Sequence, residues 1–200
     1  MNKRFLLSIL LVFILKVTSF AQTELPSTET LLKAAYKQAS EEHKKVMVIF
    51  HASWCGWCKK MEASINEPAL NKMFTDNYVI VYVDVLEQPA KKNLENPGSL
   101  DLMTKYKGEK AGLPFWYITD AKGKELADSQ IRPAGAGFDS YGENVGCPAE
   151  ESEVGFFIQV LKSTSNLKDD ELSLIAKCFV QNKSAPVVKP VPAAKDTASH

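Results

Sequence analysis

The chain has 200 residues, with 24 Lys and Arg against 24 Asp and Glu, so its formal net charge at pH 7 is zero. This balance gives no overall electrostatic reason to bind nucleic acid or an anionic membrane. Four cysteines are too few for a disulfide-stapled miniprotein of this length, so their spacing has to carry the information. The length suits one domain with a proper core.

The N-terminus has the pattern of a secretory signal peptide. Lys3 and Arg4 precede an apolar run over 5–17, and small residues at Ser19 and Ala21 mark a cleavage site after Ala21. The run is shorter than the roughly 20 apolar residues that span a bilayer. The sequence therefore predicts a periplasmic or secreted protein with no stable membrane insertion after cleavage, in a compartment where disulfides persist.

After the leader, apolar periodicity predicts an alternation of helices and strands. An i, i+3, i+4 stripe from Ser27 onwards indicates an amphipathic helix, which Ser27 or Thr28 can cap. Continuous apolar runs over 46–51 and 78–85 are typical of strands covered on both faces. The segment between them is helical in composition but contains Pro68, which either kinks one helix or opens a second.

A helix, a hairpin and a loop are predicted next. Ser99 is expected to cap a helix over 99–107. Residues 115–119 and the segment from Lys124 onwards have the pattern of two hairpin strands. The glycine-rich interval 132–146 has no periodicity and is predicted to be an irregular surface loop.

Two more helices and a tail complete the expected organisation. Pro148 suits the first position of one helix, and Asp169 or Asp170 is expected to cap the last. The Pro-, Ala- and Lys-rich segment 184–200 is predicted to be a disordered tail. The folded domain is therefore expected over residues 22–183, after a signal peptide over 1–21.

The stretch HASWCGWCKKME places two cysteines, separated by two residues, where a predicted strand gives way to a predicted helix. The unpaired N–H groups and positive dipole end of that helix stabilise a thiolate at Cys55. The same spacing lets Cys58 attack a mixed disulfide formed on Cys55 and release the partner thiol. We therefore expect Cys55 to be the nucleophile and Cys58 the resolving thiol.

Three other interpretations of this pair compete. A structural zinc site normally needs four ligands, and Cys147 and Cys178 are single and distant in sequence, although His43 and His51 are near. A c-type haem requires histidine after the second cysteine, where Lys59 stands. A purely structural disulfide stays open, although so short a loop constrains little chain entropy. We expect no metal and no cofactor beyond the cysteine pair.

The motif WCGWC after a buried strand, followed by a hairpin that starts beyond Leu113-Pro114, resembles the thioredoxin superfamily and, more narrowly, its secreted bacterial members. The resemblance covers roughly residues 31–161. It implies an α/β, thioredoxin-like fold with a central mixed β-sheet flanked by helices and an extra C-terminal helix. It also implies that Leu113-Pro114 is the family's cis-proline site, which lies opposite the cysteines and pairs with an extended substrate chain.

The resemblance further implies thiol–disulfide exchange on exported proteins, as a reductase rather than an oxidase, with electrons from a membrane donor. Trp57 lies in the bend between the cysteines, where it can touch a substrate. Trp54 matches the family's tryptophan before the first cysteine, which shields the thiols. The competing class is a non-catalytic binding protein that keeps the fold and uses the CxxC pair as a structural bridge.

Two departures from the family pattern concern the proton path and the redox potential. Ile49 stands where thioredoxins carry a buried aspartate that helps proton transfer at the resolving thiol. Glu62, four residues after Cys58 on the same helical face, is either a substitute relay or a solvated surface residue. Gly56-Trp57 replaces the typical Gly-Pro, and these residues tune the potential in this superfamily, so the direction of electron flow stays open.

The remaining cysteines have two interpretations. Cys147 is expected at the start of one helix, and Cys178 on the apolar face of the last helix. In an oxidising compartment they could form a second disulfide, which would close a loop of roughly 30 residues and contribute about 3–4 kcal/mol. Alternatively, Cys178 is a buried small apolar residue and Cys147 is only a helix-start residue.

Overall fold

A computed structural model describes residues 25–184 of the chain. The signal peptide predicted over 1–21 and nearly all of the predicted tail lie outside the described residues. Both therefore stay predictions. Among residues 25–184, no helix combines the length and apolar character needed to cross a membrane.

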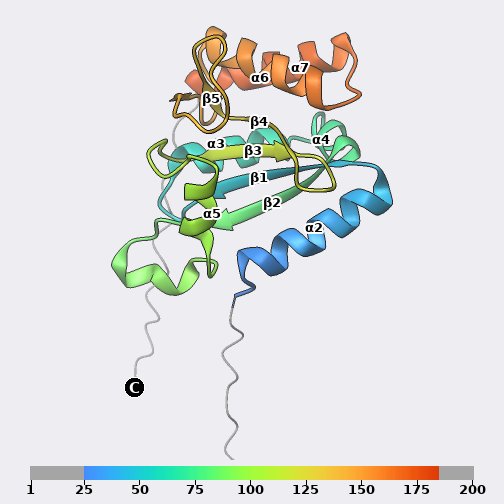
Figure 1. The fold of residues 1–200 in the computed structure, drawn as a ribbon. Coiled ribbons are helices and arrows are strands. Elements are labelled where there is room, and N and C mark those ends of the chain that lie inside the picture. The colour runs from blue at the N-terminus through green and yellow to red at the C-terminus, as the bar shows by residue number, and fades with distance from the viewer. Residues whose placement is uncertain (1–24, 185–200) are drawn as a thin grey trace, which may run out of the picture.

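The centre of the fold is a four-stranded mixed sheet in the order β2-β1-β3-β4 (Figure 1). Its strands are β1 (Lys45–His51), β2 (Tyr78–Asp84), β3 (Phe115–Thr119) and β4 (Glu125–Asp128). β1 pairs in parallel with β2 and antiparallel with β3, and β3 pairs antiparallel with β4. The predicted strands and hairpin are thus confirmed, and with them the mixed α/β sheet.

Helices cover both faces of the sheet. They are α2 (Thr28–Glu42), α3 (Gly56–Ile65), α4 (Asn71–Asn77), α5 (Ser99–Lys105), α6 (Glu151–Thr164) and α7 (Asp169–Val180). Alternate side chains of β1 point to opposite faces, so Met47 and Ile49 pack with α3, α4, α6 and α7, whereas Val46 and Val48 pack with α2 and α5. In Figure 1, α6 and α7 lie above the sheet and α2 lies below it.

The two C-terminal helices belong to the core. Phe157 of α6 and Phe179 of α7 are both 0% exposed, and their ring centroids lie 5.0 Å apart. Phe74 of α4 contacts both rings, at centroid distances of 6.4 and 6.3 Å. Burying each such side chain contributes about 1.5–3 kcal/mol. The extension is therefore part of the same domain as the sheet.

The interruption at Pro68 separates two helices. α3 ends at Ile65 and α4 begins at Asn71, so there are two helices and not one kinked helix. Pro68 lies in the turn between them and does not open α4, whose cap is Leu70. The glycine-rich interval 132–146 is irregular for most of its length, as predicted, but Glu143–Asn144 forms a short strand, β6. This strand pairs with β5 (Gln130–Ile131), which periodicity alone did not reveal.

One helix cap is confirmed and one is wrong. Ser27 caps α2, because its hydroxyl oxygen accepts a hydrogen bond from the Thr30 N–H at 3.2 Å. Ser99, in contrast, is the first residue of α5 and the cap is Gly98, whose φ is 82°. Glycine adopts this left-handed conformation without strain, and a Cβ here would lie 2.9 Å from the Thr28 hydroxyl oxygen.

The predicted start of α6 is wrong by three residues. Pro148 precedes the helix, whose cap is Glu150. The Glu153 carboxylate reaches back and accepts hydrogen bonds from the Ala149 and Glu150 N–H groups, both at 3.0 Å. These bonds satisfy backbone donors that the first turn leaves unpaired, so the helix begins where this carboxylate can reach.

The predicted cap of α7 is wrong for the same reason. Neither Asp169 nor Asp170 is the cap, because both lie within the first turn after Lys168. The Lys168 N–H donates to the Glu171 carboxylate at 2.8 Å. The glutamate three residues into the helix thus fixes the start of α7.

Glu125, at the start of β4, makes stability depend on pH. Its Oε1 is buried without a hydrogen-bond partner among the described residues. Burial, reinforced by the negative charge of Asp128 and opposed by Arg132 and Lys105, raises its pKa from 4.5 to about 7. The folded chain therefore holds a proton that the unfolded chain releases near pH 4.5. This contribution to stability is present below pH 4.5 and lost as pH rises through 7.

We expect Glu125→Gln, which keeps the size of the side chain and removes its charge, to raise the free energy of unfolding at pH 8. The expected gain is about 1–2 kcal/mol, discounted for the partial exposure of the group. Near pH 4 the variant and the wild type should differ little. Urea unfolding at both pH values measures this, and an equal difference at the two values would contradict the assignment.

Candidate active site at the Cys55–Cys58 disulfide

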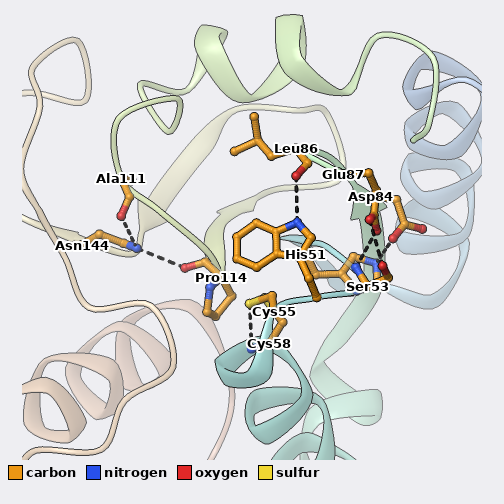
Figure 2. The surroundings of a disulfide bond; sticks show 11 residues. His51, Ser53, Cys55, Cys58, Asp84, Leu86, Glu87, Ala111, Pro114 and Asn144 are labelled. Carbon is orange, nitrogen blue, oxygen red and sulfur yellow. Dashed lines mark hydrogen bonds and ion pairs between the residues drawn. A yellow bond between two sulfur atoms is a disulfide. The ribbon is translucent and has the colours of Figure 1, made fainter. Parts of the chain in front are cut away.

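Cys55 and Cys58 form a disulfide at the junction between β1 and α3, where the sequence placed them. The two sulfurs are 1.99 Å apart and the two Cα atoms 5.3 Å. Cys55 is the N-cap of α3, and its Sγ accepts a hydrogen bond from the Cys58 backbone N–H at 3.1 Å (Figure 2). The sulfur of Cys55 therefore faces the positive end of the helix dipole, which favours a thiolate over a thiol.

The disulfide itself is well covered. Cys55 is 3% exposed and Cys58 is 5% exposed, and both pack in a small apolar cluster with Ala52. Leu113 packs against this cluster from the loop before β3. The cysteine pair therefore presents little surface to solvent.

The Leu113–Pro114 bond is cis, as the family resemblance implied. The loop that carries it runs directly into β3, which begins at Phe115. Figure 2 shows Pro114 beside the cysteine pair, on the side opposite α3. The structure therefore brings together the two parts of the site that the motif and the proline predicted separately.

Both tryptophans at the site are exposed. Trp54 is 44% exposed and its indole N–H donates to the Leu86 carbonyl at 2.8 Å. Trp57 is 41% exposed, and the Lys60 Nζ lies 4.2 Å from its ring centroid. This cation–π contact holds the indole on the surface of α3, beside the thiols rather than in the core.

Lys60 also ties the active-site helix to the C-terminal extension. Its Nζ donates to the Asn182 carbonyl at 2.7 Å, and the residue is 5% exposed. Sequence reasoning missed this contact. The two residues are 122 positions apart, and nothing in the local pattern around either one indicates the other.

An acidic cluster lies at the carboxyl ends of β1 and β2. The His51 Nε2 lies 3.3 Å from the Asp84 Oδ1, and Glu87 accepts a hydrogen bond from the Ser53 hydroxyl at 2.8 Å. Burial raises the pKa of Asp84; His51 opposes the shift, while the charges of Glu87 and Glu62 add to it. The sequence could have indicated this cluster, because His51 and Asp84 end two neighbouring parallel strands and face each other in register.

The position of the family's buried aspartate is apolar. Ile49 is 1% exposed and packs in the apolar cluster beneath α3, so it supplies no carboxyl group to Cys58. Glu62 is exposed on α3, and its charge is close enough to contribute to the raised pKa values of Tyr82 and Asp84. The role of Glu62 as a proton relay stays a prediction.

The second disulfide is not formed, because Cys147 and Cys178 are both free thiols. Cys147 is buried and contacts the Asn182 Nδ2 at 3.5 Å, and burial raises its pKa to about 12. Cys178 is half-buried, and burial raises its pKa while a hydrogen bond with Ser64 opposes the shift. Ser64 and Asn182 also bond to each other, so each thiol contacts a polar side chain. Cys147 is also not a helix-start residue, since α6 begins at Glu151.

Within residues 25–184, no group of three or more histidine, cysteine, aspartate or glutamate side chains is arranged to hold a metal ion.

Comparison with known proteins assigns the family. The sequence profile of the thioredoxin-like domain matches residues 32–134, just over half of the chain. The chain belongs to this thioredoxin-like family. The thioredoxin-like fold expected from the motif is therefore confirmed.

Two relatives and one solved structure illustrate the likeness. Disulfide bond reductase DsbH of Chlamydia pneumoniae is 29% identical over 103 residues, which are 50% of this chain and 61% of that protein. A thioredoxin of Alicyclobacillus acidocaldarius is 29% identical over 105 residues, 52% of this chain and 95% of that protein. The structure of a DsbH oxidoreductase is 25% identical, covers 68% of this chain and 82% of that one, and has a TM-score of 0.39. This thioredoxin-like chain leaves more than a third of the chlamydial relative unmatched.

The free thiols should differ in accessibility. In the oxidised, folded protein we expect iodoacetamide at pH 8 to modify Cys178 well before Cys147, because Cys147 is more deeply buried and its pKa is about 12. Peptide mass spectrometry after timed labelling measures both rates. Cys178→Ser serves as the control. In this variant Cys147 is the remaining free thiol, and it should be labelled only when the protein unfolds. Equal rates, or a Cys147–Cys178 bridge in the native protein, would contradict the structure.

Proposed function

We propose that this thioredoxin-like protein is a thiol–disulfide oxidoreductase that reduces disulfides in exported proteins. The observation that carries the proposal is the Cys55 sulfur at the N-terminus of α3, in hydrogen-bond contact with the Cys58 N–H and beside the cis-proline loop. The likeness to a protein named disulfide bond reductase supports the same chemistry.

The reaction follows from the order of the two thiols. In the reduced protein, the Cys55 thiolate attacks one sulfur of the substrate disulfide, forms a mixed disulfide and releases one substrate thiolate, which takes up a proton. Cys58 then loses its proton and attacks the Cys55 sulfur. The Cys55–Cys58 disulfide forms, the second substrate thiol leaves, and two electrons have passed to the substrate.

The substrate chain is held between the cis-proline loop and Trp57. A cavity of about 360 Å³ opens here, with Trp57, Leu113 and Pro114 in its lining. Among the described residues, the backbone N–H and carbonyl of Leu113 have no hydrogen-bond partner, so they are free to pair with an extended chain. Trp54, which directly precedes Cys55 and is also exposed, completes the proposed contact surface.

The resolving step requires a group that accepts the Cys58 proton, and we assign this role to Glu62. It lies one helical turn after Cys58 and is exposed, so it can pass the proton on to water. The charge of Glu62 also reaches the acidic cluster, since it contributes to the raised pKa of Asp84.

The proposed direction of electron flow and the proposed export both rest on the predicted signal peptide. Its pattern predicts export, and an oxidising compartment is where a reductase finds disulfide substrates. Each turnover leaves the protein oxidised, so the proposal includes a membrane electron donor that restores the dithiol. Residues 22–183 form the exported catalytic domain in this proposal.

The proposal predicts different defects for the two cysteines. Cys55→Ala should abolish reduction of insulin disulfides, at least a thousandfold, because no nucleophile remains. Cys58→Ala should instead accumulate a mixed disulfide between Cys55 and the substrate, because the resolving thiol is absent. Insulin turbidity with dithiothreitol as the electron source, and non-reducing electrophoresis of the Cys58→Ala protein, measure the two effects.

The matched control is Cys178→Ala, which removes a thiol outside the site and should leave turnover within twofold. Failure of the wild type to reduce insulin, with no mixed disulfide on Cys58→Ala, would leave the structural bridge and a non-catalytic binding protein as the better account. Catalysis only of disulfide formation in a reduced, unfolded substrate would reverse the assigned direction.

A further inference from the structure

Asn144, at the end of the short strand β6, makes two hydrogen bonds to the cis-proline loop. Its Nδ2 donates to the Ala111 carbonyl at 2.9 Å and to the Pro114 carbonyl at 3.1 Å (Figure 2). These two carbonyls flank Leu113, the residue whose backbone faces the substrate in the proposed mechanism. One carboxamide therefore holds the loop at both ends of the proposed pairing site.

The support behind Asn144 is rigid. Next to it, the Val145 N–H donates to the Ser129 carbonyl at 2.8 Å. The fully buried indole N–H of Trp116 donates to the Gly146 carbonyl at 2.8 Å. The Asn144 Oδ1 itself accepts from the Gly146 N–H at 3.2 Å, so both ends of the carboxamide are engaged and its orientation is fixed.

The segment also packs directly on the proline. Gly146 has φ of 59°, and a Cβ at this position would lie 3.3 Å from the Pro114 carbonyl oxygen and 3.6 Å from the Pro114 Cδ. The backbone thus approaches the cis-proline loop more closely than most side chains would allow. Asn144 reaches the two carbonyls because this approach brings it within hydrogen-bond distance.

We propose that Asn144 is a positioning residue that fixes the cis-proline loop so that the Leu113 backbone can pair with a polypeptide substrate. The inference rests on the proposed function and deepens it. Because the loop is already held at Ala111 and Pro114, it loses little conformational freedom when a substrate binds. This lower entropic cost favours pairing of the free Leu113 N–H and carbonyl groups with an extended chain. A small disulfide makes no such backbone pairing, so its reduction depends on the cysteines far more than on Asn144.

The test compares protein and small disulfides in Asn144→Asp. Aspartate keeps the shape of the side chain, removes both N–H donors and turns an acceptor towards two carbonyl oxygens. We expect KM for insulin to rise about five- to tenfold with kcat within about twofold, the change expected from losing hydrogen bonds of ordinary strength. The effect on a small aromatic disulfide should be at least about fivefold smaller.

The matched control is Asn77→Asp at the end of α4. Asn77 makes a comparable pair of bonds, donating to the Met73 carbonyl at 2.9 Å and accepting from the Asn166 N–H at 2.9 Å. This variant loses an equivalent local contact away from the cis-proline loop, so its KM for insulin should stay within twofold of the wild type. If Asn144→Asp does not fold, Asn144→Ser is measured in the same comparison.

An unchanged KM for insulin in the Asn144 variant, or a parallel loss with the small disulfide, would overturn the inference while leaving the proposed function intact. The same KM rise in Asn77→Asp would also overturn it, because the effect would then follow from lost stability. A wild-type protein that reduces neither substrate would refute the proposed function and with it this inference.

Discussion

The contact between the Cys58 backbone N–H and the Cys55 sulfur is the interaction on which the site depends. It exists because β1 ends at His51 and α3 begins at Gly56. Cys55 is therefore the N-cap of α3, the position whose side chain can accept hydrogen bonds from the unpaired N–H groups of the first turn. Moving the strand end by one residue would place the sulfur elsewhere. The chemistry is thus set by the junction between a buried strand and a helix.

The rest of the fold brings two further segments to this junction. The cis-proline loop directly precedes β3, the strand that pairs antiparallel with β1. Asn144 at the end of β6 holds this loop by two hydrogen bonds. The C-terminal helices pack on the same face as α3, and Lys60 joins the two by its bond to the Asn182 carbonyl. The extension therefore supports the site as well as the core.

The sequence predicted the order of helices and strands and the place of Cys55, because these depend on local periodicity and on one short motif. The cis-proline was implied by the family resemblance. Sequence reasoning misplaced the start of α6 and the cap of α7, because Glu153 and Glu171 reach back to cap the first turn where a nearby proline or aspartate looked equally suitable. It missed Asn144 because its partners Ala111 and Pro114 lie 33 and 30 positions away along the chain, and no local pattern links them. The second disulfide was plausible by compartment but is not formed.

The most direct measurement of the central claim is the alkylation rate of reduced Cys55 at pH 6.5, in the folded protein and in the protein unfolded by urea. Because α3 favours the thiolate only when folded, the account predicts a rate at least about tenfold higher in the folded state, despite the cover over the site. Cys58, which is inside the helix, should show no such increase. A folded-state rate for Cys55 equal to or below the unfolded rate would contradict the account.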